Sequence, residues 1–306
     1  MTTIATPVAS CSALSRQAGE PLEGSATLTD TYLLLEYSDA WGEKALEDSN
    51  LPAEVKAHLK AYQKSHSQAK VLLIRRPGQK SGQGIHFFIA STAPGREALY
   101  EYRLVMYADL LDMDFDSILA SQPADCCRNE PLFLVCTNGR RDQCCARFGQ
   151  EVFKALNDAT TGLSKPQVWE CSHVGGHRFA ANLLMLPTGL LYGRVDPASA
   201  IEILAAARKG EPYLPNLRGR TSFPPGAQAA EIFLRRQLAE QPATSDQALI
   251  LLDLREIPPL GWQVEFLSET SGELYRLMVG VEHIPDQVFD GCSLDKRTAL
   301  VRYYRI

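Results

Sequence analysis

Two cysteines and two histidines stand in short segments that each follow an apolar run. The first segment reads PLFLVCTNGRRDQCC and contains Cys136 and Cys145, which are nine positions apart. The second reads VWECSHVGGHRF and contains His173 and His177, which are four positions apart. Thiolates and imidazoles prefer zinc, copper or iron–sulfur clusters to hard ions such as Mg²⁺. These residue types therefore predict a site for a soft or borderline metal.

The cysteine segment is predicted to bring a thiol to the start of a helix. Its strand at 132–136 ends at Cys136, at the sheet edge where ligands bind in open α/β proteins. Gly139 permits a sharp turn, and the returning chain brings Cys144 or Cys145 to the helix start. The positive end of the helix dipole lowers a thiol pKa there. For either cysteine alone, simple burial as an apolar residue is the competing interpretation.

The histidine segment places two imidazoles on either side of two glycines. His173 and His177 lie on one side of a turn if the backbone is helix-like. The glycines disfavour a regular helix and permit close approach of the backbone to a cofactor. A capping or packing role is the alternative for each histidine. Cys136 and Cys145 follow the end of another predicted strand, and their pairing with the two histidines favours metal binding.

The elements that must position these segments follow one another in two similar series. The first series has strands at 31–37, 71–76 and 85–91, helix within 41–64, a turn at 77–84, and more strand and helix up to Leu119. The second has a strand at 132–136, a helix at 146–156, a strand at 167–171 and a hairpin at 182–195, at a spacing of roughly 100 residues. Alternating strands and helices predict an α/β fold.

The chain is expected to divide into four regions. Residues 1–27 form an irregular lead-in, 28–128 the first domain, 129–207 the second, and 208–306 a C-terminal region. A helix at 196–207 has Asp196 and Ser199 near its start. The C-terminal region begins with a linker or wrapping segment rich in Pro, Gly and Arg at 208–226 and continues with a helix at 227–238. Strands from 248 onward form a small β-rich extension.

Composition and charge indicate which partners the chain gives no reason to expect. The chain has 306 residues, of which 45% are hydrophobic and 22% charged, as in soluble globular proteins. A net charge of −5 gives no reason to expect nucleic acid or an anionic membrane as a partner. No apolar run approaches the roughly 20 residues that span a bilayer. The N-terminus lacks a basic start followed by a long apolar stretch, so we expect a cytoplasmic protein.

Eight cysteines are too few for a disulfide-stapled chain of this length. The vicinal pairs at 126–127 and 144–145 suit structural disulfides poorly. We therefore expect a reducing compartment and metal ligation.

The two metal-binding segments resemble the sucrase/ferredoxin-like family. The resemblance rests on CTNGRRDQCCARFG and WECSHVGGHRFAANLLMLPTGLLYGRV. The opening CSALSRQAGEPLEGSA and the later LRGRTSFPPGAQAAE also resemble bacterial members, so the resemblance extends to about residue 240. It implies a thioredoxin-like ferredoxin domain holding a [2Fe–2S] cluster, without the Rieske fold. Carried over by position, it implies the ligands Cys136, Cys145, His173 and His177.

The resemblance also ranks the neighbouring cysteines. In all-cysteine relatives the second ligand pair is Cys-x-x-x-Cys, which His173 and His177 match, so Cys171 falls outside the ligand set. Cys144 adjoins Cys145 and competes with it for the metal. The first half has IRRPGQKSGQ where the second has ECSHVGGHRF. The resemblance thus implies two tandem thioredoxin-like domains, the first without a cluster.

Three arginines lie beside these ligands in the sequence. Arg140, Arg141 and Arg178 could stabilise a reduced cluster or receive an acidic redox partner. Ordinary surface charge is the equal alternative.

The resemblance implies an electron-transfer protein with unknown redox donor and acceptor proteins, rather than a stand-alone enzyme. Two neutral imidazoles in place of two thiolates raise the reduction potential, and solvent-accessible rings would couple electron to proton uptake. The alternative is a structural Cys₂His₂ zinc protein, although zinc-finger cysteines lie two to four residues apart. The chain has no C-x-x-C pair for thiol exchange, and no carboxylate pair is singled out for sucrose hydrolysis.

Overall fold

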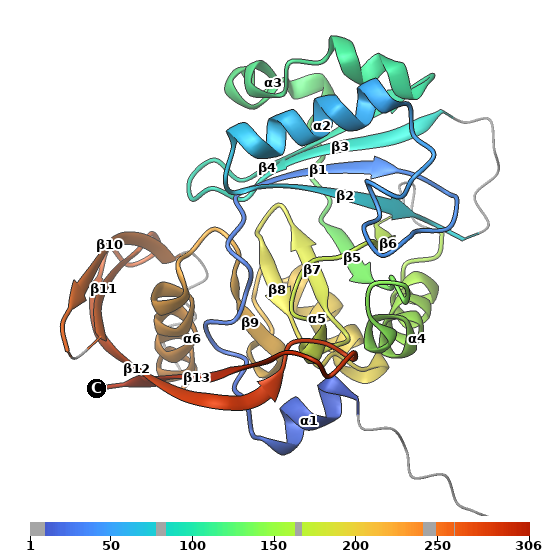
Figure 1. Ribbon diagram of the computed structural model, residues 1–306. Helices are drawn as coiled ribbons and strands as arrows, with labels where there is room; N and C mark the ends of the chain where they lie inside the picture. The colour runs from blue at the N-terminus through green and yellow to red at the C-terminus, as the bar shows by residue number, and fades with distance from the viewer. Residues whose placement is uncertain (1–9, 78–83, 163–166, 241–248, 260) are drawn as a thin grey trace, which may run out of the picture.

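A large twisted sheet runs through the molecule, and a second sheet curves around one helix beside it (Figure 1). The computed structural model describes residues 10–77, 84–162, 167–240, 249–259 and 261–306. Most of the turn expected at 77–84 therefore lies outside the described residues. Within them, no helix is both long enough and apolar enough to cross a membrane.

The first half of the large sheet is built from a βαβ unit followed by a hairpin. Its elements are β1 (Thr31–Glu36), α2 (Ala53–Ser65), β2 (Ala69–Arg75), β3 (Ile85–Ser91), β4 (Ala98–Leu104), the 3₁₀ helix η1 (Tyr107–Asp112), α3 (Phe115–Ser121) and the 3₁₀ helix η2 (Ala124–Cys126). Strand β1 is parallel to β2 and antiparallel to β3, which pairs with β4. One or two helices are expected within 41–64, and the structure has α2, which begins only at Ala53 because Pro52 disfavours a helical residue before it.

The second half repeats these strand directions. Its elements are β5 (Leu132–Cys136), α4 (Gln143–Ala159), β6 (Val168–Cys171), the 3₁₀ helix η3 (His177–Phe179), β7 (Leu183–Leu186), β8 (Leu190–Tyr192), α5 (Pro197–Arg208), the 3₁₀ helix η4 (Leu214–Asn216) and β9 (Leu217–Arg220). The order β4-β3-β1-β2 is mirrored by β6-β5-β7-β8, and the halves join where β2 pairs antiparallel with β6. The segment expected as a linker at 208–226 contains β9, which extends this sheet beside β8.

Alternation along the strands explains how three apolar cores form. Successive strand residues point to opposite faces of a sheet. In β1, Leu33 and Leu35 pack with α2 and α3, whereas Leu34 lies in a core shared by the strands of both halves. The outer face of the second half packs against α4 and α5. The α/β class is thereby confirmed, and the cysteines Cys136 and Cys145 lie in the shared core.

The two ends of the chain also carry regular structure. Residues Cys11–Gln17 form α1, capped by the Ser10 hydroxyl, so the lead-in is not wholly irregular. Helix α6 (Pro225–Ala239) packs on the four antiparallel strands β10 (Leu249–Ile257), β11 (Gly261–Ser268), β12 (Leu274–Phe289) and β13 (Arg297–Arg305). In Figure 1 the red connection between β12 and β13 reaches toward α1 and α4. This brings residues near both ends of the sequence beside the cysteine segment.

Candidate metal centre

The start of α4 sends its two neighbouring cysteines in different directions. The helix begins at Gln143, three residues earlier than expected, because the carboxylate of Asp142 caps it by accepting the backbone N–H of Cys144 at 2.9 Å. Cys145 joins the shared core, and Cys144 joins a separate small cluster. Adjacent residues on a helix do not face the same way, so the two neighbouring thiols enter different clusters.

Cys136 and Cys145 meet in the interior. Gly149, one turn after Cys145, lets α4 approach β5 so closely that a Cβ there would overlap the carbonyl oxygen of Cys136. The pKa of Cys136 lies well below its ordinary value because the thiol of Cys145, and then that of Cys171, donates a hydrogen bond to its sulfur. A thiolate is the form that binds metals. Gly139 also permits close approach, here to Ala146 of the same helix.

The two histidines lie side by side at the same end of the core. Their ring centroids are 5.4 Å apart, and His173 lies beside the thiol of Cys136. The Nδ1 atoms of His173 and His177 are both buried without a hydrogen-bond partner. Buried polar atoms are almost always paired, so unpaired ring nitrogens on two neighbouring histidines need an explanation. Coordination of a metal centre by both nitrogens would supply it.

The outer side of His177 faces the C-terminal region. Burial lowers the pKa of His177, and the ring forms a hydrogen bond with the backbone of Asp290. The Nε2 atom lies 3.1 Å from the position that a Cβ would take at Gly291. A ligating histidine commonly makes such a backbone hydrogen bond through its second nitrogen, which fixes the ring orientation.

The glycines between the histidines make room for protein groups. Gly175 and Gly176 have φ values of +103° and +71°, which few other residues adopt. A Cβ at Gly175 would overlap Thr27, and one at Gly176 would overlap the guanidinium of Arg218. The two glycines therefore let the backbone of this loop approach Thr27 and Arg218, in addition to any cofactor.

A buried arginine that sequence reasoning missed holds this loop in place. Arg218 donates hydrogen bonds to the carbonyl oxygen of Gly175 at 2.9 Å and to the side chain of Asn182 at 2.8 Å. Its guanidinium also lies 4.7 Å from the ring centroid of Phe179. Burial lowers the pKa of Arg218 to about 9. The segment LRGR carries no local signal for this role.

Lys70 is a second group near the sulfurs that the sequence did not single out. Burial lowers its pKa to about 8, while the nearby Cys136 and Cys171 act in the opposite direction. Cys171 itself is buried, and burial raises the pKa of its thiol well above the ordinary value. It thus touches Cys136 as a neutral hydrogen-bond donor.

The three arginines expected near the ligands lie around the site. Arg141 is 3.5 Å from a Glu43 oxygen. Arg178 pairs with Glu20 at 2.8 Å and with Asp290 at 3.5 Å. Arg140 and Arg141 line a surface depression of about 510 Å³ that His177 also lines. The histidine edge of the site is therefore close to solvent.

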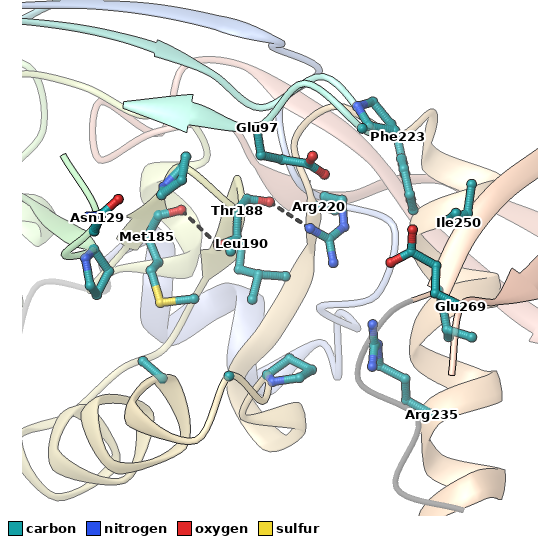
Figure 2. A pocket seen from close by; sticks show the side chains of 18 residues that line it. Glu97, Asn129, Met185, Thr188, Leu190, Arg220, Phe223, Arg235, Ile250 and Glu269 are labelled. Atoms are coloured by element: carbon teal, nitrogen blue, oxygen red, sulfur yellow. Dashed lines mark hydrogen bonds between the residues drawn. The ribbon is translucent and has the colours of Figure 1, made fainter. Parts of the chain in front are cut away.

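Another cavity lies elsewhere. Figure 2 shows Glu97 and Glu269 at a cavity of about 520 Å³ with Arg220 and Arg235. Arg220 donates to the carbonyl oxygen of Thr188 at 2.8 Å. None of the four candidate ligands lines this cavity.

One protein family and two curated proteins resemble parts of this chain. A family model described as sucrase/ferredoxin-like matches residues 22–219. The protein named altered inheritance of mitochondria protein 32 is 31% identical over 110 residues in Candida glabrata and 30% identical over 107 residues in Eremothecium gossypii. Each alignment covers 31% of this chain, and the chain spans about one third of these relatives' length.

Two solved structures show a weaker likeness. They are cysteine-to-serine variants of the thioredoxin-like [2Fe–2S] ferredoxin from Aquifex aeolicus, with TM-scores of 0.26 and 0.25 and identities of 21% and 22%. Each match covers 29% of this chain and 97% of the ferredoxin. The family assignment rests instead on the model match over residues 22–219, which spans most of the large sheet. The chain belongs to the sucrase/ferredoxin-like family.

Proposed function

We propose that this protein is an electron carrier that holds a [2Fe–2S] cluster through Cys136, Cys145, His173 and His177. The observation that carries the proposal is the pair of buried, unpartnered Nδ1 atoms of the two histidines. They lie at the end of the core that also holds the thiols of Cys136 and Cys145. The donor set matches the chemistry of a soft, sulfur-rich metal centre.

The charge of this ligand set determines the kind of carrier. Two ferric ions and two sulfides sum to about +2, so two thiolates and two neutral imidazoles leave the bound cluster neutral. A neutral centre accepts an electron more readily than a four-thiolate centre, as Rieske centres show relative to plant-type ferredoxins. The ring of His177 lines the surface depression, which supports proton exchange with solvent.

We also propose that residues 129–207 form a thioredoxin-like ferredoxin domain and 28–128 a related domain without a cluster. The mirrored strand order supports this proposal. In the first half, β2 runs to Arg75, at the position where β6 leads into the histidine loop. The described residues of that half place no cysteine or histidine after this strand before β3.

Partner proteins are proposed to approach the depression beside His177. Its lining mixes Arg140, Arg141 and Lys296 with acidic side chains such as Glu43 and Asp290. Charges of both signs around the depression would orient a partner protein rather than attract it strongly. A cytoplasmic location stays a prediction, and the name of the two relatives refers to inheritance of mitochondria.

The experiment is metal analysis, visible spectroscopy and electron paramagnetic resonance of the reduced protein. Wild type is expected to contain iron and to be reddish-brown. Cys136→Ser and Cys145→Ser are expected to lose most of the iron. His173→Cys and His177→Cys are expected to keep iron with a changed resonance signal and a lower potential, because each adds negative charge. Cys127→Ser, at an exposed cysteine, is the matched control and should behave as wild type.

Two results would refute the proposed function. A colourless wild type holding zinc at these four residues would make the site a structural Cys₂His₂ centre. Histidine variants with an unchanged resonance signal would remove the imidazoles from the ligand set. Cys144→Ser decides between the vicinal cysteines, and retention of iron in that variant is the expected result.

A further inference from the structure

A second group of metal-binding side chains lies on the other side of the first turn of α4. It consists of Cys11 from α1, Asp142 and Cys144 from the start of α4, and Cys292 from the connection between β12 and β13. One ligand atom from each of these residues lies within 4.8 Å of the others. None of the four belongs to the proposed iron–sulfur ligands.

The three sulfurs form a triangle. Cys144 lies 3.1 Å from Cys292, Cys11 lies 3.4 Å from Cys292, and Cys11 donates to Cys144 at 3.7 Å. A zinc ion with Zn–S bonds of about 2.3 Å holds its sulfurs about 3.8 Å apart in a tetrahedron. A disulfide would need about 2.05 Å and would leave the third sulfur out. The spacing is closer to shared coordination than to a disulfide.

The carboxylate of Asp142 lies beside the three sulfurs and offers a fourth ligand atom. Its oxygens lie 3.8 and 3.9 Å from the Cys11 sulfur. They also accept the backbone N–H of Cys144 at 2.9 Å and of Cys292 at 2.8 Å, which holds the carboxylate at the sulfurs. Cys11, Cys144 and Asp142 are at most 5% exposed. A buried carboxylate held beside three cysteine sulfurs is a donor set of the kind that binds zinc in proteins.

We propose that these residues bind a zinc-type divalent ion through three thiolates and one carboxylate oxygen. Soft thiolates select such an ion over Mg²⁺ or Ca²⁺. The ion would join α1, α4 and the β12–β13 connection, three segments distant in the sequence.

The position of this site gives it a second consequence. The connection that carries Cys292 also carries Asp290, whose backbone binds the His177 ring and whose carboxylate lies 3.5 Å from Arg178. An ion bound to Cys292 would therefore hold this connection against the histidine side of the first site. This consequence rests on the proposed function, whereas binding of the ion does not.

The test measures zinc and iron separately in protein purified under reducing conditions with zinc supplied. Wild type is expected to hold about one zinc per chain besides its iron. Cys11→Ser and Cys292→Ser should lose zinc and keep iron. Cys136→Ser should lose iron and keep zinc, and Cys127→Ser should keep both. X-ray absorption at the zinc edge should show three sulfur neighbours and one oxygen.

Cobalt(II) binding to wild type is a second test, and its result does not depend on whether the variants fold. Cobalt should bind wild type with the intense thiolate charge-transfer absorption of a tetrahedral sulfur site, and added zinc should displace it. Wild type without zinc and without this cobalt signal would overturn the proposal. So would a disulfide between Cys144 and Cys292 in the reduced preparation. Joint loss of iron and zinc in Cys292→Ser would instead assign these residues to the iron site.

Discussion

Replacing Gly149 by alanine tests the contact that brings the two cysteines of the proposed cluster together. The added Cβ would lie about 0.8 Å inside the 3.0 Å that such atoms keep from the carbonyl oxygen of Cys136. The obstacle is strand backbone, which cannot rotate away as a side chain can. Helix α4 must therefore move outward, and Cys145, one turn earlier, moves with it.

The free-energy change has two opposing parts. Overpacking of this kind costs about 1–3 kcal/mol. Alanine gains about 1 kcal/mol over glycine in a helix interior. The net loss of stability is therefore expected to be about 0–2 kcal/mol. The loss of bound iron should be proportionally larger than the loss of stability, because metal ligands tolerate a displacement of only about 0.5 Å.

Urea unfolding and the iron-to-protein ratio measure these two effects for Gly149→Ala. Glu151→Ala is the matched control, since Glu151 is an exposed residue on the same helix and its replacement also favours the helix. The control should match wild type in both measurements. Gly149→Ala that is as stable as wild type and carries a full complement of iron would refute the packing argument.

Three further predictions concern other parts of the molecule. Arg218→Lys keeps the charge but loses the fork that binds Gly175 and its neighbours, so urea unfolding should show a loss of at least about 2 kcal/mol; a loss below about 0.5 kcal/mol would contradict the structure. A hydrogen bond with His86 is the main cause that lowers the pKa of Glu101 to about 2, so its carboxylate stabilises the fold above pH 4.5, and this contribution disappears as the pH falls toward 2. Glu101→Gln should therefore be less stable than wild type by up to about 3 kcal/mol at pH 7, and the gap should narrow at pH 3 and close toward pH 2; an unchanged gap would count against the linkage. Finally, the reduction potential should fall as the pH rises, by up to about 59 mV per unit, in voltammetry from neutral to alkaline pH; a flat profile would exclude a titrating imidazole.

Local pattern predicted most of the strands and helices around the site. The apolar runs at 31–37, 85–91 and 132–136 correspond to β1, β3 and β5. Asp196 and Ser199 form the capping box of α5 that their spacing suggests. Such features depend on residues within one or two turns, so they can be read from a short stretch of sequence.

Tertiary structure decided which cysteines lie together. Cys144 and Cys145 are adjacent in the sequence, yet one faces Cys11 and Cys292 and the other faces Cys136. The sequence separation of Cys11 and Cys292 gives no local signal of their contact. Their meeting depends on α1 packing beside the β12–β13 connection.

The same distinction holds for the histidines. Their types and spacing alone indicated metal chemistry for His173 and His177. Only the folded chain shows that both Nδ1 atoms are buried without partners, and that Arg218 from β9 binds the loop between the two histidines. Residue chemistry is thus set by the sequence itself, whereas burial and convergence arise only when distant segments pack together.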